Sequence, residues 1–315
     1  MEKKKPKIFL SYAHIDLGFA KKIYGDLIRY GLDVWFDKES LLAGQDWERE
    51  IKKLIRESDY FIALLSDNCL SKRGFVHSEL KLSFEVIEKY FPADSGIFII
   101  PVRLDDCKPS DAYERLGKIH WIDVFPEYSY QVGLKKILDV VNPGATMLRT
   151  EPVELTEGDA AVMIKRIGFY DRNRNPEGKG VIHQYISQVL NGDTIILDEA
   201  TGLIWQNGGS SQVLEFEQAK AWIEELNQKY YAGFNDWRLP TLEEAMSLIE
   251  PIEMNGNLYI DPVFDSTQRW IGTADLVKGE SWTWVVSLTR GECGSYQFSY
   301  DGFVRAVRSV QSSEN

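Results

Sequence analysis

The residues whose type and position could support chemistry centre on Glu79, in the stretch that follows the apolar run 60–66. That run predicts a buried strand, and the next residues predict a helix with an apolar stripe at steps of three and four. Glu79 lies about 100° from the centre of the stripe, on the border between core and solvent. Phe75 adds an aromatic ring four residues earlier. Because ligands of open parallel sheets bind beyond the carboxyl ends of the strands, Glu79 is a candidate catalytic acid in a nucleoside pocket. The alternative is an ordinary solvated helix glutamate.

Length and charge narrow the class of protein. The chain has 315 residues, of which 44% are hydrophobic, which is enough for two folded domains. The net charge of −12 is distributed unevenly along the chain. Residues 1–142 carry 22 Lys and Arg against 23 Asp and Glu, whereas residues 143–315 carry 14 against 25. An acidic second half argues against nucleic acid or an anionic membrane as its partner.

The three cysteines are widely spaced and form no CxxC pair. They favour a reducing compartment over a disulfide framework or a zinc site, so we expect no metal. No apolar signal segment follows the basic N-terminus, and no apolar run reaches 18 residues. These features predict a cytoplasmic protein.

Short strands alternate with helices over the first 142 residues. This pattern predicts an α/β unit with a parallel sheet and helices on both faces. The expected strands are 8–12, 32–37, 60–66, 96–102 and 120–124, and the last helix spans about 129–141. Asp16 is expected to cap the first helix, and Val132 to lie in the apolar stripe of the last one.

Residues 143–160 have little apolar pattern and are expected to form a connector. Beyond them, Asn191-Gly192 between two strand-like runs predicts a β-hairpin. Helices are expected at 217–228 and 242–249, and strands near the end at 281–286 and 303–308. The second domain is therefore predicted to be α+β.

Three boxes of the first half resemble a Toll/interleukin-1 receptor (TIR) domain over residues 5–142. They are Phe9-Leu10-Ser11-Tyr12, Val34-Trp35-Phe36-Asp37 and Phe75-Val76-His77-Ser78-Glu79-Leu80. The resemblance implies a flavodoxin-like five-stranded parallel sheet. Enzymatic TIR domains split nicotinamide from NAD with a glutamate on the third helix, the position that Glu79 matches. Phe75 stands where such enzymes commonly have Trp, and Ala13 where some carry Arg.

The resemblance also implies roles for the neighbouring residues. Glu79 would stabilise a ribosyl oxocarbenium ion. Trp35 and Phe75 would form flat walls of the substrate site, while Tyr12 and Asp37 would orient the substrate. NAD is then the substrate and no cofactor is expected. The product is either linear ADP-ribose or a cyclic isomer.

The loop 38–46 is a candidate assembly contact. It carries two apolar residues, Leu41 and Leu42, and a flexible Gly44. In TIR enzymes the similar loop contacts the next protomer and completes the substrate site. The resemblance therefore implies self-association by head-to-tail stacking, which builds open filaments unless the rotation closes.

The second half resembles the Lcl C-terminal-like domain, with an expected extent of 161–310. The matching boxes are ATGLIWQ, DWRLPT and the terminal VRAVR. The resemblance implies a C-type-lectin-like fold with an unknown ligand or protein partner. Five of its tryptophans are expected to pack in the core, with a ligand surface as the alternative: Trp205, Trp237, Trp270, Trp282 and Trp284. Arg238 is expected to form a structural ion pair.

The two resemblances together imply a bacterial, NAD-consuming immune effector that acts against phage, with the C-terminal domain as sensor or oligomerisation gate. Two alternatives stay open. The TIR domain could be a non-catalytic scaffold that binds other TIR domains. The protein could also be a lectin-like ligand-binding protein that uses its TIR domain as a reporter.

Overall fold

The chain divides into two compact units, one up to Ala145 and one from Thr146 to Val310. The computed structural model describes residues 5–36, 47–71, 82, 85, 97–112, 114–126, 130–297 and 302–310. Each unit has its own hydrophobic core. We describe the two units separately.

The first unit is built on a five-stranded sheet in which every neighbouring pair is parallel. The strand order β2-β1-β3-β4-β5 is the order of flavodoxin-like folds, and it confirms the predicted fold class. The strands are β1 (Lys7–Ser11), β2 (Asp33–Trp35), β3 (Tyr60–Leu65), β4 (Ile99–Arg103) and β5 (Ile122–Asp123).

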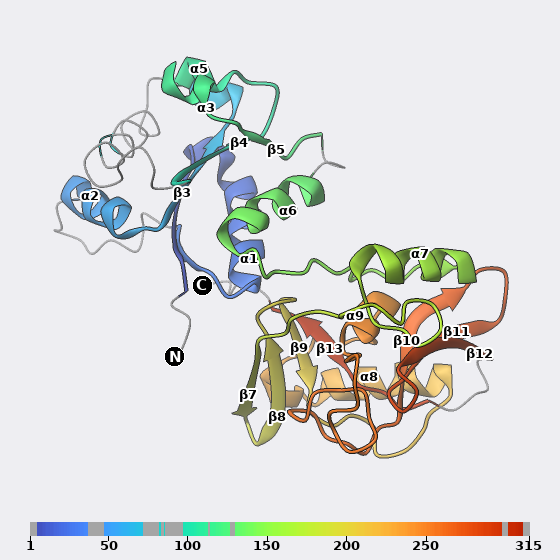
Figure 1. Cartoon of the computed structure of the whole chain (residues 1–315). Helices are drawn as coiled ribbons and strands as arrows, with labels where there is room; N and C mark the ends of the chain where they lie inside the picture. The colour runs from blue at the N-terminus through green and yellow to red at the C-terminus, as the bar shows by residue number, and fades with distance from the viewer. Residues whose placement is uncertain are drawn as a thin grey trace. The chain divides into compact units, whose positions relative to one another are not determined.

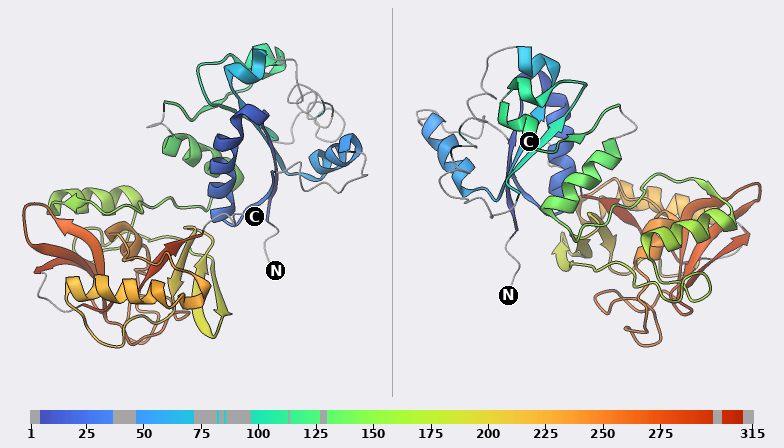
Figure 2. Two further views of the ribbon diagram at one scale, coloured as in Figure 1. Left: turned by 180° about the vertical axis from the view of Figure 1, so that it is seen from behind. Right: turned by 45° about the horizontal axis from the view of Figure 1, so that its top comes forward.

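Helices cover both faces of this sheet (Figures 1 and 2). Helices α1 (Leu17–Arg29) and α6 (Tyr130–Val141) lie on one face, and α2 (Trp47–Glu57) lies on the other. The shorter helices are η1 (His14–Asp16), α3 (Asp67–Ser71), α5 (Pro109–Ala112) and η3 (Glu114–Lys118).

Two expectations for these helices are wrong. Asp16 stands at the N-terminus of α1, but its side chain makes no capping hydrogen bond, because Ser66 holds its carboxylate. Val132 is 58% exposed, while Tyr130 and Gly133 are buried in its place. The α6 stripe is therefore rotated relative to the one expected from the sequence.

The second unit combines two four-stranded sheets with three longer helices. One sheet has the order β12-β11-β10-β6 and the other β13-β9-β8-β7. Their strands are β6 (Glu154–Leu155), β7 (Tyr185–Leu190), β8 (Asp193–Asp198), β9 (Leu203–Gln206), β10 (Trp270–Val277), β11 (Trp282–Ser287), β12 (Glu292–Gln297) and β13 (Val307–Ser309). The helices are α7 (Glu157–Ile167), α8 (Phe216–Gln228), η5 (Tyr231–Gly233) and α9 (Leu242–Ser247).

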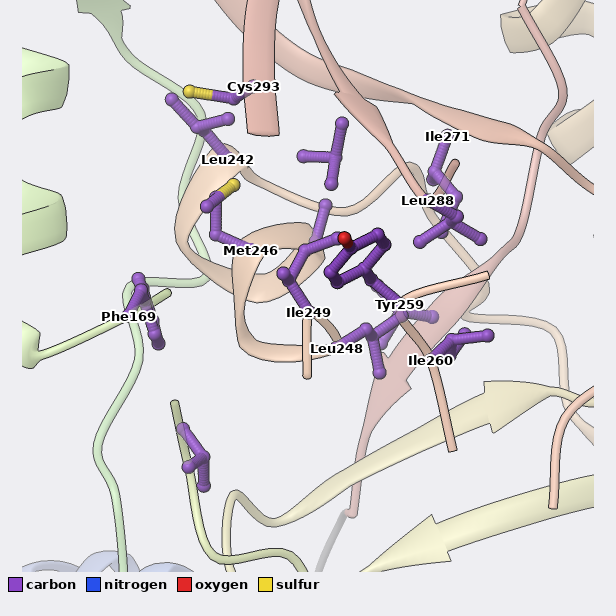
Figure 3. Close-up of a cluster of buried hydrophobic side chains, with 14 of the residues drawn as sticks. Phe169, Leu242, Met246, Leu248, Ile249, Tyr259, Ile260, Ile271, Leu288 and Cys293 are labelled. Atoms are coloured by element: carbon purple, nitrogen blue, oxygen red, sulfur yellow. The ribbon is translucent and has the colours of Figure 1, made fainter. Parts of the chain in front are cut away.

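Helix α9 is at the centre of the larger core, since every one of its residues is buried. Leu242 and Met246 belong to the same buried cluster as Phe169 and Leu288, which come from loops distant in the sequence, and Figure 3 labels all four. A second cluster packs under α8 and includes Trp237. The unit is therefore α+β, as predicted.

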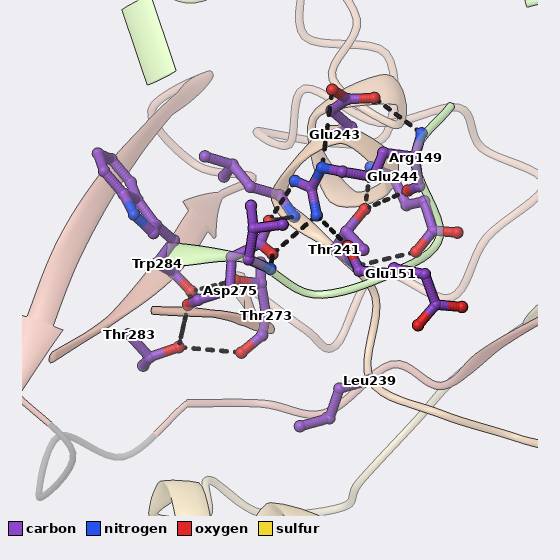
Figure 4. A network of polar contacts seen from close by, with 12 residues as sticks. Arg149, Glu151, Leu239, Thr241, Glu243, Glu244, Thr273, Asp275, Thr283 and Trp284 are labelled. Atoms are coloured by element: carbon purple, nitrogen blue, oxygen red, sulfur yellow. Dashed lines mark hydrogen bonds and ion pairs between the residues drawn. The ribbon is translucent and has the colours of Figure 1, made fainter. Parts of the chain in front are cut away.

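Local signals in the second half are confirmed. Asn191 and Gly192 both have positive φ, at 53° and 91°, as a tight turn between β7 and β8 requires. Trp205, Trp237 and Trp284 are buried in the core as expected, whereas Trp270 and Trp282 are only half-buried. Arg238 forms the expected ion pair, with two hydrogen bonds of 2.7 and 2.5 Å to the fully buried Glu244 (Figure 4 labels this glutamate).

The expected connector 143–160 is not a separate segment. From Thr146 onward it belongs to the second unit, and it contains β6 and the first turn of α7. Thr156 and Asp159 form a capping box that starts α7, and Ala160 is fully buried. The second unit therefore begins earlier than the sequence pattern indicated.

A fully buried carboxylate fixes this early segment in place. Asp275, on β10, accepts hydrogen bonds of 2.9 and 2.6 Å from the Arg149 guanidinium (Figure 4). It also accepts bonds of 2.7 Å from the backbone amides of Val153 and Leu242. One side chain thus joins the start of the unit, α9 and β10.

We predict that Arg149→Met lowers the free energy of unfolding by about 3–5 kcal/mol, because Asp275 keeps a buried charge without its counterion. Lys229→Met is the matched control, since it breaks an exposed pair with Glu225 and is expected to cost less than about 1 kcal/mol. Urea denaturation of the full chain measures both values. An equal effect of the two substitutions would contradict the assigned role of Arg149.

Candidate functional site

The candidate site lies at the carboxyl edge of the parallel sheet, where ligands of such sheets bind. Tyr12 follows β1 directly and Trp35 ends β2, and β1 pairs with β2 in a register that sets Phe9 opposite Trp35. The two described candidates therefore come from neighbouring strands. The other candidates, namely Asp37, Leu41, Leu42, Gly44, Phe75 and Glu79, lie outside the described residues.

Trp35 belongs to a ladder of stacked rings that crosses three strands. Its indole stacks on Phe9 at a centroid distance of 4.5 Å, and Phe9 stacks on Phe61 at 5.3 Å. The same cluster contains Ile51 and Ile55 of α2. Since Phe9 covers one face of the half-buried indole, at most the opposite face is left for a substrate.

Tyr12 belongs to a different aromatic stack. Its ring lies 5.1 Å from Phe36, which in turn lies 4.7 Å from Tyr24 of α1. Only 8% of Tyr12 is exposed. Because α1 and α2 cover opposite faces of the sheet, Tyr12 and Trp35 pack on opposite faces (Figure 2). One substrate would contact both only across the edge of the sheet.

A polar cluster at this edge was not predicted from the sequence. The Ser66 hydroxyl, just after β3, donates a 2.8 Å hydrogen bond to Asp16 Oδ2 and accepts a 3.1 Å bond from the Cys69 amide. Burial raises the pKa of Asp16, and the nearby Asp105 charge adds to this, against the opposing effect of the Ser66 bond. Ser66 thus ties the start of α1 to the turn after β3.

Asp105, which follows β4, holds the next turn. Its carboxylate accepts from the Asp67 amide at 3.0 Å and from the Cys107 amide at 3.2 Å. Burial, with the Asp105 charge beside it, raises the pKa of the Cys107 thiol to about 12. The thiol stays protonated at neutral pH, so Cys107 is not an activated nucleophile.

Within the described ranges, no group of three or more His, Cys, Asp or Glu is arranged to hold a metal ion. None of the helices in those ranges combines the length and the apolar character that crossing a bilayer requires.

We predict that Tyr12→Ala destabilises the first unit by about 3–5 kcal/mol, because it removes a buried ring from the stack with Phe36. Tyr12→Phe keeps the ring and is expected to cost about 1 kcal/mol or less. Chemical denaturation of the two variants gives both values. Similar losses would mean that the hydroxyl, and not the ring, stabilises this edge.

Comparison with known proteins identifies both halves. The family model of the TIR domain matches residues 8–138, and that of the Lcl C-terminal domain matches residues 194–308. No curated protein matches the chain.

Three solved structures resemble the chain. The TIR domains of the activated Roq1 resistosome, which directly recognises the pathogen effector XopQ, share 21% identity over 43% of this chain and 98% of theirs, with a TM-score of 0.35. The TIR domain of the Toll-related receptor TRR-2 from Hydra magnipapillata shares 15% identity over 42% of this chain and 96% of its own chain, with a TM-score of 0.35. A TIR-STING receptor from C. gigas in complex with 2',3'-cGAMP shares 15% sequence identity over 64% of this chain and 69% of its own chain, with a TM-score of 0.32.

The matched ranges agree with what the fold shows of each half. The first contains the parallel sheet from β1 to β5, and the second runs from β8 to β13. The chain therefore combines a TIR domain, at residues 8–138, with an Lcl C-terminal domain, at residues 194–308.

Proposed function

We propose that the TIR domain cleaves nicotinamide from NAD and that Glu79 is its catalytic residue. The observation that carries this proposal is the TIR family match over 8–138, a range that contains Glu79. The resemblance of Phe75-Val76-His77-Ser78-Glu79-Leu80 to a TIR box implies that Glu79 takes the place of the catalytic glutamate of TIR enzymes. The flavodoxin-like strand order supports it, because the carboxyl edge of such a sheet is a ligand-binding edge.

The described residues near Glu79 in the sequence are compatible with this role. Leu82 is helical and packs against the cluster of Phe9, Phe61 and Trp35. On the helix expected from the sequence, Glu79 precedes Leu82 by about one turn and so shares its side of the helix. Glu79 would then belong to the same face of the sheet as Trp35, whose free indole face is the proposed wall of the site.

The proposed reaction needs few catalytic groups. Nicotinamide leaves NAD as a neutral base from a cationic ring, so its departure needs no general acid. The ribosyl group is left as an oxocarbenium ion, which one fixed carboxylate stabilises by charge and by holding the ribose hydroxyls. Capture by water gives ADP-ribose, and capture by a group of the same molecule gives a cyclic isomer.

The cellular role follows from the same resemblance. We propose an immune effector that consumes NAD in the cytoplasm of a bacterium during phage infection. The three thiols support a reducing compartment, since Cys69, Cys107 and Cys293 are all free and buried.

We predict that Glu79→Gln lowers the rate of nicotinamide release by at least about a hundredfold, since it removes the charge that stabilises the transition state. Glu85→Gln is the matched control, because Glu85 is exposed and helical in the same region, and it is expected to keep the wild-type rate. Chromatography of NAD reactions under crowding measures both rates and separates linear from cyclic products. Release at the wild-type rate by Glu79→Gln would remove Glu79 from the mechanism, and no release by the wild-type protein would favour the scaffold alternative.

We further propose that cleavage requires self-association through the loop with Leu41, Leu42 and Gly44, as in TIR enzymes with a similar loop. We expect the activity per protomer to fall over about a hundredfold dilution, because head-to-tail contacts are lost by mass action. Leu41→Ser/Leu42→Ser should shift this loss to higher protein concentration. Constant specific activity in a protein that stays monomeric by light scattering would overturn the assembly requirement.

A further inference from the structure

A cleft of about 530 Å³ opens in the second unit where three segments of chain meet. They are residues 179–185, which lead into β7, residues 250–251, which follow α9, and residues 261–263. Its volume lies in the range of about 300–1,000 Å³ that is usual for small-molecule sites. Neither the TIR match nor the proposed NAD site involves these residues.

Among the residues that line the cleft, the buried His183 already has an acceptor at each ring nitrogen. His183 Nδ1 lies 2.7 Å from Asp198 Oδ2, and His183 Nε2 lies 2.7 Å from the Ser247 carbonyl oxygen. Both ring nitrogens face acceptors, so both carry protons. Burial alone lowers the pKa of His183, but the hydrogen bond and charge of Asp198 outweigh it and the pKa is raised. Tyr185 stacks on this imidazolium at 4.5 Å.

Two carboxylates face the cleft without a cationic hydrogen-bond partner, although the His183 charge acts on Glu250. Glu250 is half-buried, and among the described residues its carboxylate makes no ion pair or hydrogen bond with a side chain. Asp261 accepts a 2.7 Å bond from the Val263 amide, which leaves its charge unpaired within the described part of the chain. Burial raises the pKa of Glu250, and the Asp261 charge adds to this against the effect of His183. The exposed Lys179 on the rim is the remaining charged group of the lining.

Apolar side chains line the rim beside these carboxylates. Ile182 is 85% exposed, the largest exposed fraction of any large apolar side chain in the described ranges, and Pro251 and Val263 also line the cleft. The Tyr185 phenol oxygen is buried and has no hydrogen-bond partner among the described residues. An atom without exposed surface cannot contact a ligand in the open cleft, so Tyr185 contributes only its ring to the lining.

We propose that this cleft binds an organic cation, an ammonium or guanidinium group on an apolar stem. The charged group would lie between Glu250 and Asp261, the stem would cover Ile182, and Tyr185 would contribute its ring. A carboxylate or phosphate ligand is disfavoured by the two unpaired acids, and a metal ion would find only these two ligands. The cation can be a free amine or the basic side chain of a peptide, which share this chemistry.

Direct titration of the full chain tests the proposal. Calorimetry with butylguanidinium is expected to give saturable one-site binding, whereas butanol and pentanoate should bind at least about tenfold more weakly. Glu250→Gln and Asp261→Asn should each weaken butylguanidinium binding by about tenfold or more. Glu253→Gln, an exposed acid nearby that does not line the cleft, is the control and should leave binding unchanged. A capped Gly-Arg-Gly peptide identifies the source, since tighter binding than butylguanidinium indicates a peptide and weaker binding a free amine.

Several outcomes would overturn the proposal. They are no binding of butylguanidinium, equal binding of butanol, and wild-type affinity in Glu250→Gln. Ile182→Ser cannot disturb the core, because its side chain is exposed, and it should weaken binding severalfold even if an acidic-site variant fails to fold. The same titration on Glu79→Gln separates this proposal from NAD cleavage. Binding there should equal that of the wild-type protein whether or not the TIR domain is catalytic.

Discussion

The second unit depends on buried carboxylates that are saturated with donors. Asp275 is fully buried and takes four hydrogen bonds, from the Arg149 guanidinium and from two backbone amides. Asp171, also fully buried, accepts from the amides of Arg174 and Cys293. A charge inside a protein is tolerated only with such partners, and several of them, such as Arg149 for Asp275 and Cys293 for Asp171, are distant in the sequence. These acids therefore fix loops that no regular ladder reaches.

This constraint separates two kinds of acidic residue within one acidic half. Asp275 has Arg149 and Glu244 has Arg238, so these acids contribute to the fold and carry no unbalanced charge. Glu250 has no such partner among the described residues, although it is half-buried. Glu250 and Asp261, which form no ion pair with a described residue, are the two acids of the proposed cation site.

Elements set by local chemistry were predictable from the sequence. The Asn191-Gly192 turn needs only two residues that tolerate positive φ, and the parallel sheet follows from alternating strands and helices. Strand β10 was missed because Asp275 interrupts its apolar pattern, and its partner Arg149 is distant in the sequence. Helix α7 carried a readable signal in Thr156 and Asp159 that was passed over.

The position of the candidate site was predictable from the sequence, but the packing of its residues was not. The edge of the sheet followed from strand ends, which placed Tyr12 and Trp35 on neighbouring strands. Their packing on opposite faces depends on which helix covers each face, and that is a tertiary property.

The charge of the acidic half limits how a ligand of the second unit could act on the TIR site. Residues 143–315 carry a net charge of −11, and one bound cation per copy changes it to −10, so the Coulomb repulsion between two copies falls by only about a sixth. A ligand gate must therefore work through a contact that differs between free and assembled forms, because only differential affinity shifts that equilibrium.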